Sequence, residues 1–70
     1  MRTMTEIGAA MERSRLAAGL SAAAVEKRTC VRAATVRMYE RGLVWPGLYN
    51  LLTLAECYGV GLAELIGGGD

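Results

Sequence analysis

Residues 19–42 read GLSAAAVEKRTCVRAATVRMYERG, and the breaks within this stretch predict two short helices with a brief connection between them. Ser21 is a good N-cap, because its hydroxyl can accept a hydrogen bond from a backbone N–H in the first turn of a helix. The alanine-rich segment 22–28 that follows has strong helix propensity. After a break at residues 29–31, a second helical stretch is expected over residues 32–41, and Gly42 ends it.

Apolar residues at helical spacing predict one helix before this stretch and two after it. The predicted face of the first helix, between residues 3 and 18, consists of Ile7, Ala10 and Met11, followed by Ser14 and Ala18. Pro46 is expected to open the fourth helix, with an apolar stripe of Leu48, Leu51, Leu52, Ala55 and Tyr58. The short fifth helix, after Gly61, carries Leu62, Leu65 and Ile66. No long segment alternates apolar and polar residues as a strand would, so the predicted fold class is all-α.

The length of 70 residues predicts one small domain, because such a chain buries only about 60% of its unfolded surface. Residues 6–66 are expected to form the domain, residues 1–5 an N-terminal arm and residues 67–70 a flexible tail. The longest apolar stretches are far below the ~20 residues of a membrane span, and no signal peptide is visible. We therefore expect a cytoplasmic protein with no membrane partner.

The net charge of +1 is divided unevenly along the chain. Residues 1–42 hold all eight Lys and Arg side chains and four Glu, whereas residues 43–70 hold three acidic side chains and no basic one. A basic half in an otherwise neutral chain is a hint of nucleic-acid binding. Chance is the alternative, because so few charges are involved.

The chemistry-bearing residues of the chain do not predict an enzyme. Cys30 and Cys57 lack the CxxC spacing of a zinc site, and the chain has no histidine to complete one. In a reducing compartment both are expected to be free thiols that pack as small residues; a reactive or bridged pair is the alternative. No serine has a plausible base, and no Gly-rich phosphate loop follows a strand. No catalytic residue, metal or cofactor is therefore predicted.

The order of these features resembles the Cro/lambda-repressor type of helix-turn-helix domain, the XRE-like family. The resemblance covers roughly residues 6–66. The features that carry it are Arg15 four residues before Gly19, Gly-Leu-Ser at 19–21, Glu-Arg-Gly at 40–42, Pro46, and Leu-Leu-x-Leu-Ala before Tyr-Gly-Val. The stretch GLSAAAVEK, together with YERG and YGV, is most similar to the BldD-like regulators of filamentous bacteria. The resemblance implies a compact five-helix, lambda-repressor-like DNA-binding domain in which the third helix, residues 33–41, lies in the major groove.

The resemblance places the candidate base-contacting residues at the start and along the third helix: Arg32, Ala33, Ala34, Arg37 and Met38. Arg32 stands where the family usually has a short polar cap. Its guanidinium cannot accept a hydrogen bond from a backbone N–H. It could instead bind guanine or a phosphate, or be solvated. Ala33 and Ala34 can contact only thymine methyl groups, or serve merely as helix formers. Arg37 is the expected main reader, and Met38 could pack against a base or a protein partner.

Further residues are assigned to the DNA backbone or to the scaffold. Arg28, Thr35 and Arg41 are candidate phosphate contacts, which would make DNA affinity steeply salt-dependent. The alternatives are a hydrogen bond of Thr35 to its own helix and arginines that are only solvated. In the family the residues corresponding to Arg15 and Glu40 pair, which fastens the first helix to the end of the third and gives both a structural role.

Two positions depart from the family pattern. Cys30 stands where glycine is common in the turn between the second and third helices. A left-handed residue other than glycine costs about 1 kcal/mol or more, so either the turn has shifted or the domain tolerates the strain. Ala22 replaces a glutamine that would brace the DNA backbone.

Residues 43–45, Leu-Val-Trp, form an apolar turn where the family generally has polar or basic residues. Either Leu43 or Val44 is expected to fold onto the core. Trp45 is expected to be partly exposed in the monomer and buried on assembly, because tryptophan is over-represented among interface hot spots. The predicted partner or dimer interface consists of Leu43, Val44, Trp45, Leu62 and Ile66.

Two functions fit this pattern. The first is a sequence-specific transcriptional regulator that binds double-stranded DNA as a homodimer, on half-sites about one DNA turn (roughly 34 Å) apart. The second is a protein-interaction accessory factor or antirepressor on the same fold, which uses the apolar 43–45 turn to bind a partner protein. The basic half of the chain favours the first; the alanines at reading positions and the near-neutral charge favour the second.

Overall fold

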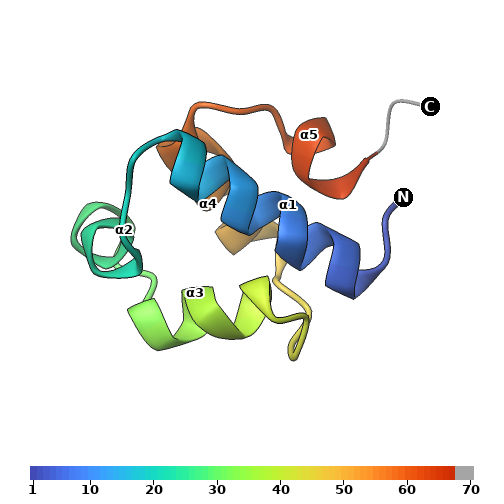
Figure 1. Ribbon diagram of the computed structural model, residues 1–70, viewed down its shortest axis with the longest axis horizontal. Coiled ribbons are helices and arrows are strands. Elements are labelled where there is room, and N and C mark those ends of the chain that lie inside the picture. Colours follow the sequence, from blue (N-terminus) through green and yellow to red (C-terminus); the bar gives the residue numbers. More distant parts are fainter. Residues whose placement is uncertain (68–70) are drawn as a thin grey trace.

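The structure is a computed structural model that describes residues 1–67, and these residues form helices without any strand. The five helices are α1 (Met4–Ala17), α2 (Ala22–Thr29), α3 (Ala33–Glu40), α4 (Leu48–Tyr58) and α5 (Leu62–Ile66). Helix α1 crosses the middle of the molecule and contacts α3, α4 and α5, while α2 contacts α3 and α4 (Figure 1). The all-α, five-helix prediction is confirmed. Of the tail expected over residues 67–70, only Gly67 lies within the described residues.

A capping box fixes the start of α1. The Thr3 hydroxyl accepts a hydrogen bond from the Glu6 backbone N–H (3.2 Å), and the Thr3 backbone N–H donates to the Glu6 carboxylate (2.9 Å). These hydrogen bonds lower the pKa of Glu6. Met4 and Thr5, which the sequence assigned to the N-terminal arm, lie in the first turn of this helix because the cap precedes them.

The residues before α1 lie against α5, which brings the two ends of the described chain together (Figure 1). The Arg2 backbone N–H donates to the Ile66 carbonyl (2.8 Å), and the Arg2 guanidinium donates to the Glu64 carbonyl (2.7 Å). A cationic side chain at the C-terminal end of a helix also interacts favourably with the helix dipole. Arg2 therefore fastens the N-terminal residues to the last helix.

The hydrophobic core takes at least one fully buried side chain from every helix. These side chains are Ile7 and Met11 of α1, Val25 of α2, Val36 of α3, Leu54 of α4 and Leu65 of α5. Because each helix is short, none would be stable in isolation, and the shared core supplies most of their stability.

The buried face of α4 contains Leu51, Ala55 and Tyr58 as predicted, but it differs from the predicted stripe at its other positions. Leu48 and Leu52 are 63% and 49% exposed, whereas Leu54, which was not part of the predicted stripe, is fully buried. Both faces of α4 are apolar, so helical periodicity alone could not decide which one packs inward. Helix α4 also begins later than predicted: Pro46 is buried ahead of it, and Gly47 occupies the N-cap position.

Helices α1 and α3 approach each other closely at Gly8. A Cβ atom at this position would collide with the Tyr39 carbonyl oxygen and lie 2.7 Å from that of Glu40. Both obstacles are backbone atoms near the end of α3, which a side-chain rotation cannot move. Glycine at position 8 therefore permits the contact between the two helices.

We expect Gly8→Ala to lower the free energy of unfolding by about 1–3 kcal/mol, because the added methyl group overpacks the α1–α3 contact. At an exposed position of a helix the same change has the opposite effect and raises the free energy of unfolding by about 1 kcal/mol. Urea unfolding followed by circular dichroism measures it. The control is Gly47→Ser, whose Cβ meets no atom within 4 Å; it should cause no loss. Equal effects of the two changes would contradict the close approach.

Candidate nucleic-acid interface

The turn between α2 and α3 keeps its left-handed residue although that residue is not glycine. Cys30 has φ 65° and ψ 6°, and it is the only non-glycine residue with positive φ among residues 1–67. Its side chain is exposed, so the prediction that it packs as a small residue is wrong for Cys30; Cys57 is partly buried, and both are free thiols. The turn has therefore not shifted, and the domain carries the strain of about 1 kcal/mol.

Hydrogen bonds within the turn offset this strain. The Cys30 N–H donates to the Glu26 carbonyl (2.8 Å), and the Val31 N–H donates to the Thr29 hydroxyl (3.1 Å). The same hydroxyl donates to the Val25 carbonyl (2.8 Å). Thr29 thus connects the last turn of α2 to the residue beyond Cys30, which fixes the direction in which α3 starts.

The start of α3 receives its cap from an unexpected residue. Arg32 occupies the N-cap position in an extended conformation, and its side chain makes no capping hydrogen bond. The Ala33 N–H donates instead to the Glu26 carboxylate (2.8 Å), which reaches across from α2. Sequence reasoning missed Glu26, although an arginine at a cap position was itself a signal that another acceptor was needed.

Arg15 and Glu40 form a bidentate ion pair between α1 and the end of α3. Arg15 Nε lies 2.7 Å from Glu40 Oε2, and Arg15 Nη2 lies 3.1 Å from Glu40 Oε1. A third hydrogen bond joins Arg15 Nη1 to the Leu20 carbonyl (2.8 Å). The two side chains are only 12% and 6% exposed. The hydrogen bond to Glu40 raises the pKa of Arg15, and the pair orients α3 against α1.

Tyr58 of α4 lies near this pair. Its hydroxyl is buried and has no hydrogen-bond partner among the described residues. Burial raises the pKa of Tyr58, and the negative charge of Glu40 adds to the effect. Tyr58 is therefore a neutral side chain of the core.

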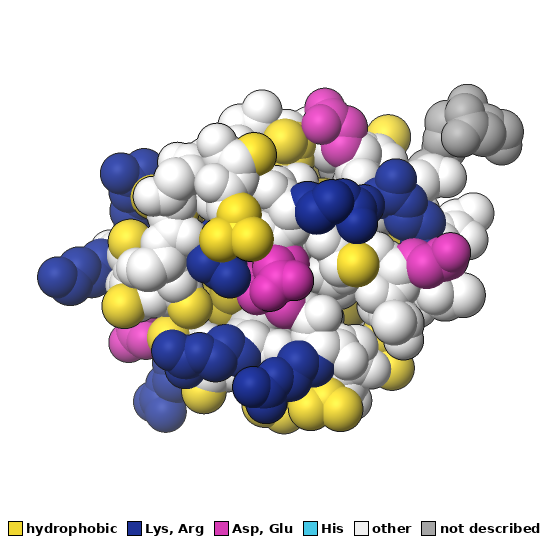
Figure 2. Space-filling view, in the orientation of Figure 1, with side chains coloured by type: hydrophobic (Ala, Val, Ile, Leu, Met, Phe, Trp, Pro, Cys, Tyr) yellow, Lys and Arg dark blue, Asp and Glu magenta, His cyan; other side chains and the backbone are white. Residues whose placement is uncertain are grey.

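The exposed side of α3 carries most of the candidate base readers. Arg32, Ala34, Arg37 and Met38 are exposed, whereas Ala33 is half-buried against the core. Figure 2 shows Lys and Arg side chains along the lower edge of the molecule, where Figure 1 places α3, and a second basic group over α1. Acidic side chains separate the two groups. Arg37 and Arg41 share a cavity with Glu12, Arg15 and Glu40, so the basic edge is bordered by carboxylates.

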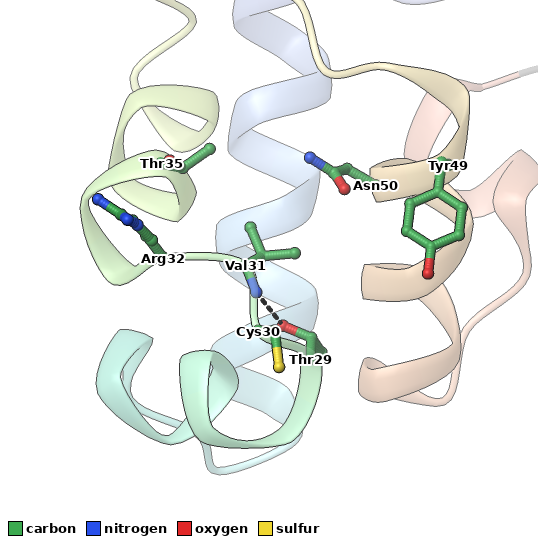
Figure 3. A pocket seen from close by; sticks show the side chains of 7 residues that line it. All are labelled: Thr29, Cys30, Val31, Arg32, Thr35, Tyr49 and Asn50. Atoms are coloured by element: carbon green, nitrogen blue, oxygen red, sulfur yellow. Dashed lines mark hydrogen bonds between the residues drawn. The ribbon is translucent and has the colours of Figure 1, made fainter.

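The candidate phosphate contacts are spread around the helix-turn-helix. Arg28 is exposed at the end of α2, and Arg41 is exposed just after α3. Thr35 is half-buried and lines a cavity of about 410 Å³ with the turn residues 29–32, Tyr49 and Asn50 (Figure 3). Asn50 donates a hydrogen bond to the Tyr39 hydroxyl (2.7 Å), which connects α4 to α3 behind this cavity.

The side chains of the apolar turn between α3 and α4 differ in burial. Leu43 and Trp45 are exposed, and Val44 packs against the core. Leu62 and Ile66, the α5 members of the predicted interface, are partly buried against the core. The exposed apolar surface continues instead along α4, which the sequence did not predict, through Leu48, Tyr49 and Leu52.

The sequence profile of the helix-turn-helix family matches residues 11–65, which include every part of the arrangement described above except the start of α1 and the last residues. The chain belongs to this family. The crystal structure of the DNA-binding domain of BldD is similar to this helix-turn-helix protein, with a TM-score of 0.81 and 33% sequence identity over 93% of this chain and 97% of that one. No curated protein sequence matches significantly.

The helix-turn-helix protein offers neither a metal cluster nor a membrane span among its described residues. Within residues 1–67, no group of three or more His, Cys, Asp or Glu side chains could hold a metal ion. Of the helices described, none combines the length and the hydrophobicity needed to cross a membrane.

We expect Arg15→Ala and Glu40→Ala each to lower the free energy of unfolding by about 3 kcal/mol, because either change leaves the other charge buried without its partner. The double variant should lose less than the sum of the two, with a coupling of about 1–3 kcal/mol in a cycle of urea unfolding measurements. Arg13→Ala, an exposed arginine of the same helix, is the control and should change stability by less than about 0.5 kcal/mol. Strictly additive losses would contradict the pairing.

Proposed function

We propose that this protein is a sequence-specific, DNA-binding transcription regulator that inserts α3 into the major groove. The observation that carries the proposal is the exposed side of α3, with Arg32 and Arg37, in a helix-turn-helix similar to the DNA-binding domain of BldD. Recognition helices of this type contact base edges with residues near their N-terminus. The family also argues for a regulator and not an enzyme.

Each part of α3 has a proposed role in binding. Arg37 and Arg32 bind base edges, since an arginine can donate two hydrogen bonds to guanine. Ala34 and Met38 make apolar contacts with bases, and Ala33 contributes less because it is half-buried. Arg28, Thr35 and Arg41 bind phosphates, which positions the protein without reading sequence.

We expect the purified protein to retain specific fragments of genomic DNA at low salt and to release them as salt is raised. The affinity of a duplex falls with a log–log slope of about −0.9 for each phosphate neutralised. Arg37→Ala should lower the affinity for a retained fragment by about ten- to a hundredfold, the value of one good base contact. Fluorescence anisotropy at two salt concentrations measures both effects.

Arg13→Ala is the matched control for this experiment, because it removes an exposed arginine of α1 and leaves α3 unchanged. It should alter affinity much less than Arg37→Ala. Retention of no fragment at any salt concentration would rule out the proposal.

We further propose that the protein binds DNA as a homodimer. A recognition helix with alanine at two reading positions discriminates weakly, and pairing on two half-sites multiplies that discrimination. The proposed dimer surface is centred on Leu43 and Trp45, with the core-packed Val44 between them in the turn. Leu62 and Ile66 are the proposed contributions from α5, which Figure 1 shows apart from this turn. Residues 43–55 contain no charged side chain, so two copies could meet there without burying an unpaired charge.

We expect Trp45→Ala to shift the protein toward monomer, with a dissociation constant raised about tenfold or more, because buried tryptophans are frequent hot spots. Sedimentation velocity over a range of protein concentrations measures the change. Leu16→Ala is the control: Leu16 is 61% exposed on α1, comparable to 52% for Trp45. An unchanged oligomeric state and unchanged partner binding in Trp45→Ala would refute this role.

The same apolar surface favours one second candidate function, a protein-interaction factor or antirepressor. Trp45, Leu48, Tyr49 and Leu52 give α4 and the turn before it an exposed apolar side without charge. Such surfaces commonly mark protein interaction sites. A salt-sensitive, sequence-specific DNA complex that Arg37→Ala weakens by about tenfold or more would reject this candidate. A clean monomer that binds no DNA would support it.

A further inference from the structure

The N-terminus of α3 presents an arrangement that a family member with a serine or threonine cap would not need. The first N–H groups of any helix lack partners within the helix and require acceptors from elsewhere. Arg32, at the N-cap position, has no acceptor in its side chain. The acceptor for these N–H groups of α3 is therefore either water or a side chain other than that of residue 32.

Glu26 of α2 supplies that acceptor, and it is bonded on both sides of the turn. Its backbone carbonyl accepts the N–H of Cys30 at 2.8 Å, and its carboxylate accepts the N–H of Ala33 at 2.8 Å. One residue thus contacts the strained left-handed position and the first residue of α3. The carboxylate also places a negative charge at the positive end of the α3 dipole, where it is favourable.

This cap leaves the Arg32 side chain free. A short polar residue at position 32 would turn its side chain back onto the α3 backbone, as Ser21 does for α2, where its hydroxyl accepts the Ala24 N–H at 3.1 Å. Arg32 is exposed, and its guanidinium extends outward from the start of α3, away from Asn50 and Tyr49 (Figure 3). The outward direction places it on the side of the proposed DNA interface.

We propose that Glu26 is the positioning residue of the recognition helix, and that by capping α3 in place of residue 32 it makes Arg32 a specificity-determining position. The inference rests on the proposed function for the role of Arg32, but not for the cap. A carboxylate at this point also excludes a DNA phosphate from the α3 N-terminus, so contacts with DNA there are made by the Arg32 side chain.

The cap is tested by thermal unfolding of the full chain, without DNA. Glu26→Ala should lower the melting temperature by about 4–8 °C, the shift that loss of one helix cap causes in a domain of this size. Glu26→Gln keeps an acceptor and should recover most of the loss. Glu26→Ala combined with Arg32→Ser should also recover at least half of it, because serine can cap α3 locally. Glu56→Ala, which removes an exposed glutamate of α4, is the control and should shift the melting temperature by no more than about 2 °C.

Specificity is tested with duplexes that the wild-type protein selects from a randomised DNA library. Glu26→Gln should select the same site as the wild type. The double variant, with its helix capped again, should lose the base preference that Arg32 supplies, and its affinity for the wild-type site should fall about ten- to a hundredfold. In the double variant we expect the melting temperature to recover and the base preference to stay lost. If Arg32 affected only stability, both would recover together.

The possible outcomes distinguish the parts of the inference. Wild-type melting of Glu26→Ala, or no recovery when Arg32→Ser is added, would overturn the cap. Selection of the wild-type site by a stable double variant would overturn the role of Arg32. If the wild type selects no site, the proposed function and the role of Arg32 fail together, while the melting experiment still decides whether Glu26 caps α3.

Discussion

The guanidinium of Arg15 holds three parts of the molecule in one arrangement. It pairs with the Glu40 carboxylate at the end of α3 and donates to the Leu20 carbonyl in the connection between α1 and α2. Arg15 thereby fixes both the start and the end of the helix-turn-helix relative to α1. Because the pair is nearly buried, its Coulomb energy is largely offset by desolvation, and its main effect is on orientation. Gly8 completes the arrangement by letting α1 and α3 approach until backbone limits them.

The turn of this helix-turn-helix achieves with side-chain hydrogen bonds what glycine and a short cap achieve elsewhere. Cys30 takes the left-handed conformation that glycine adopts at less cost. Thr29 and Glu26 accept the N–H groups that the turn leaves exposed, on Val31 and Ala33. The strain at one residue is small beside the several hydrogen bonds that hold it, so the geometry of the fold survives the departure at position 30.

Two kinds of surface adjoin each other around α3. The exposed side of α3 is basic, with Arg32 and Arg37 near the residues proposed to bind phosphate, and Glu12 and Glu40 border it. Beyond the end of α3, the chain becomes uncharged and apolar from Leu43 onward, with Trp45 and Tyr49 exposed. This adjacency favours a protein whose DNA contacts and protein contacts are made by neighbouring parts of the same helix-turn-helix. In the proposed dimer, a second copy bound at the turn would lie next to the side of α3 that is proposed to bind DNA.

The sequence by itself determined the five helices, because N-cap residues, glycines at helix ends and the spacing of apolar residues are local signals of where a helix begins and ends. It also determined the residues of the Arg15–Glu40 pair, through the family resemblance, and the exposure of Trp45, which is too large for so small a core. The sequence also predicted the burial of Leu51, Ala55 and Tyr58 on α4. Only the tertiary structure decided that Leu54, and not Leu48, joins them, because both leucines fit helical spacing and the choice depends on where the neighbouring helices pack. The cap from Glu26 and the half-burial of Leu62 and Ile66 were likewise decided by the tertiary structure. The cap and the burial both depend on contacts with residues that folding brings close, and the spacing of residues along the chain does not predict such contacts.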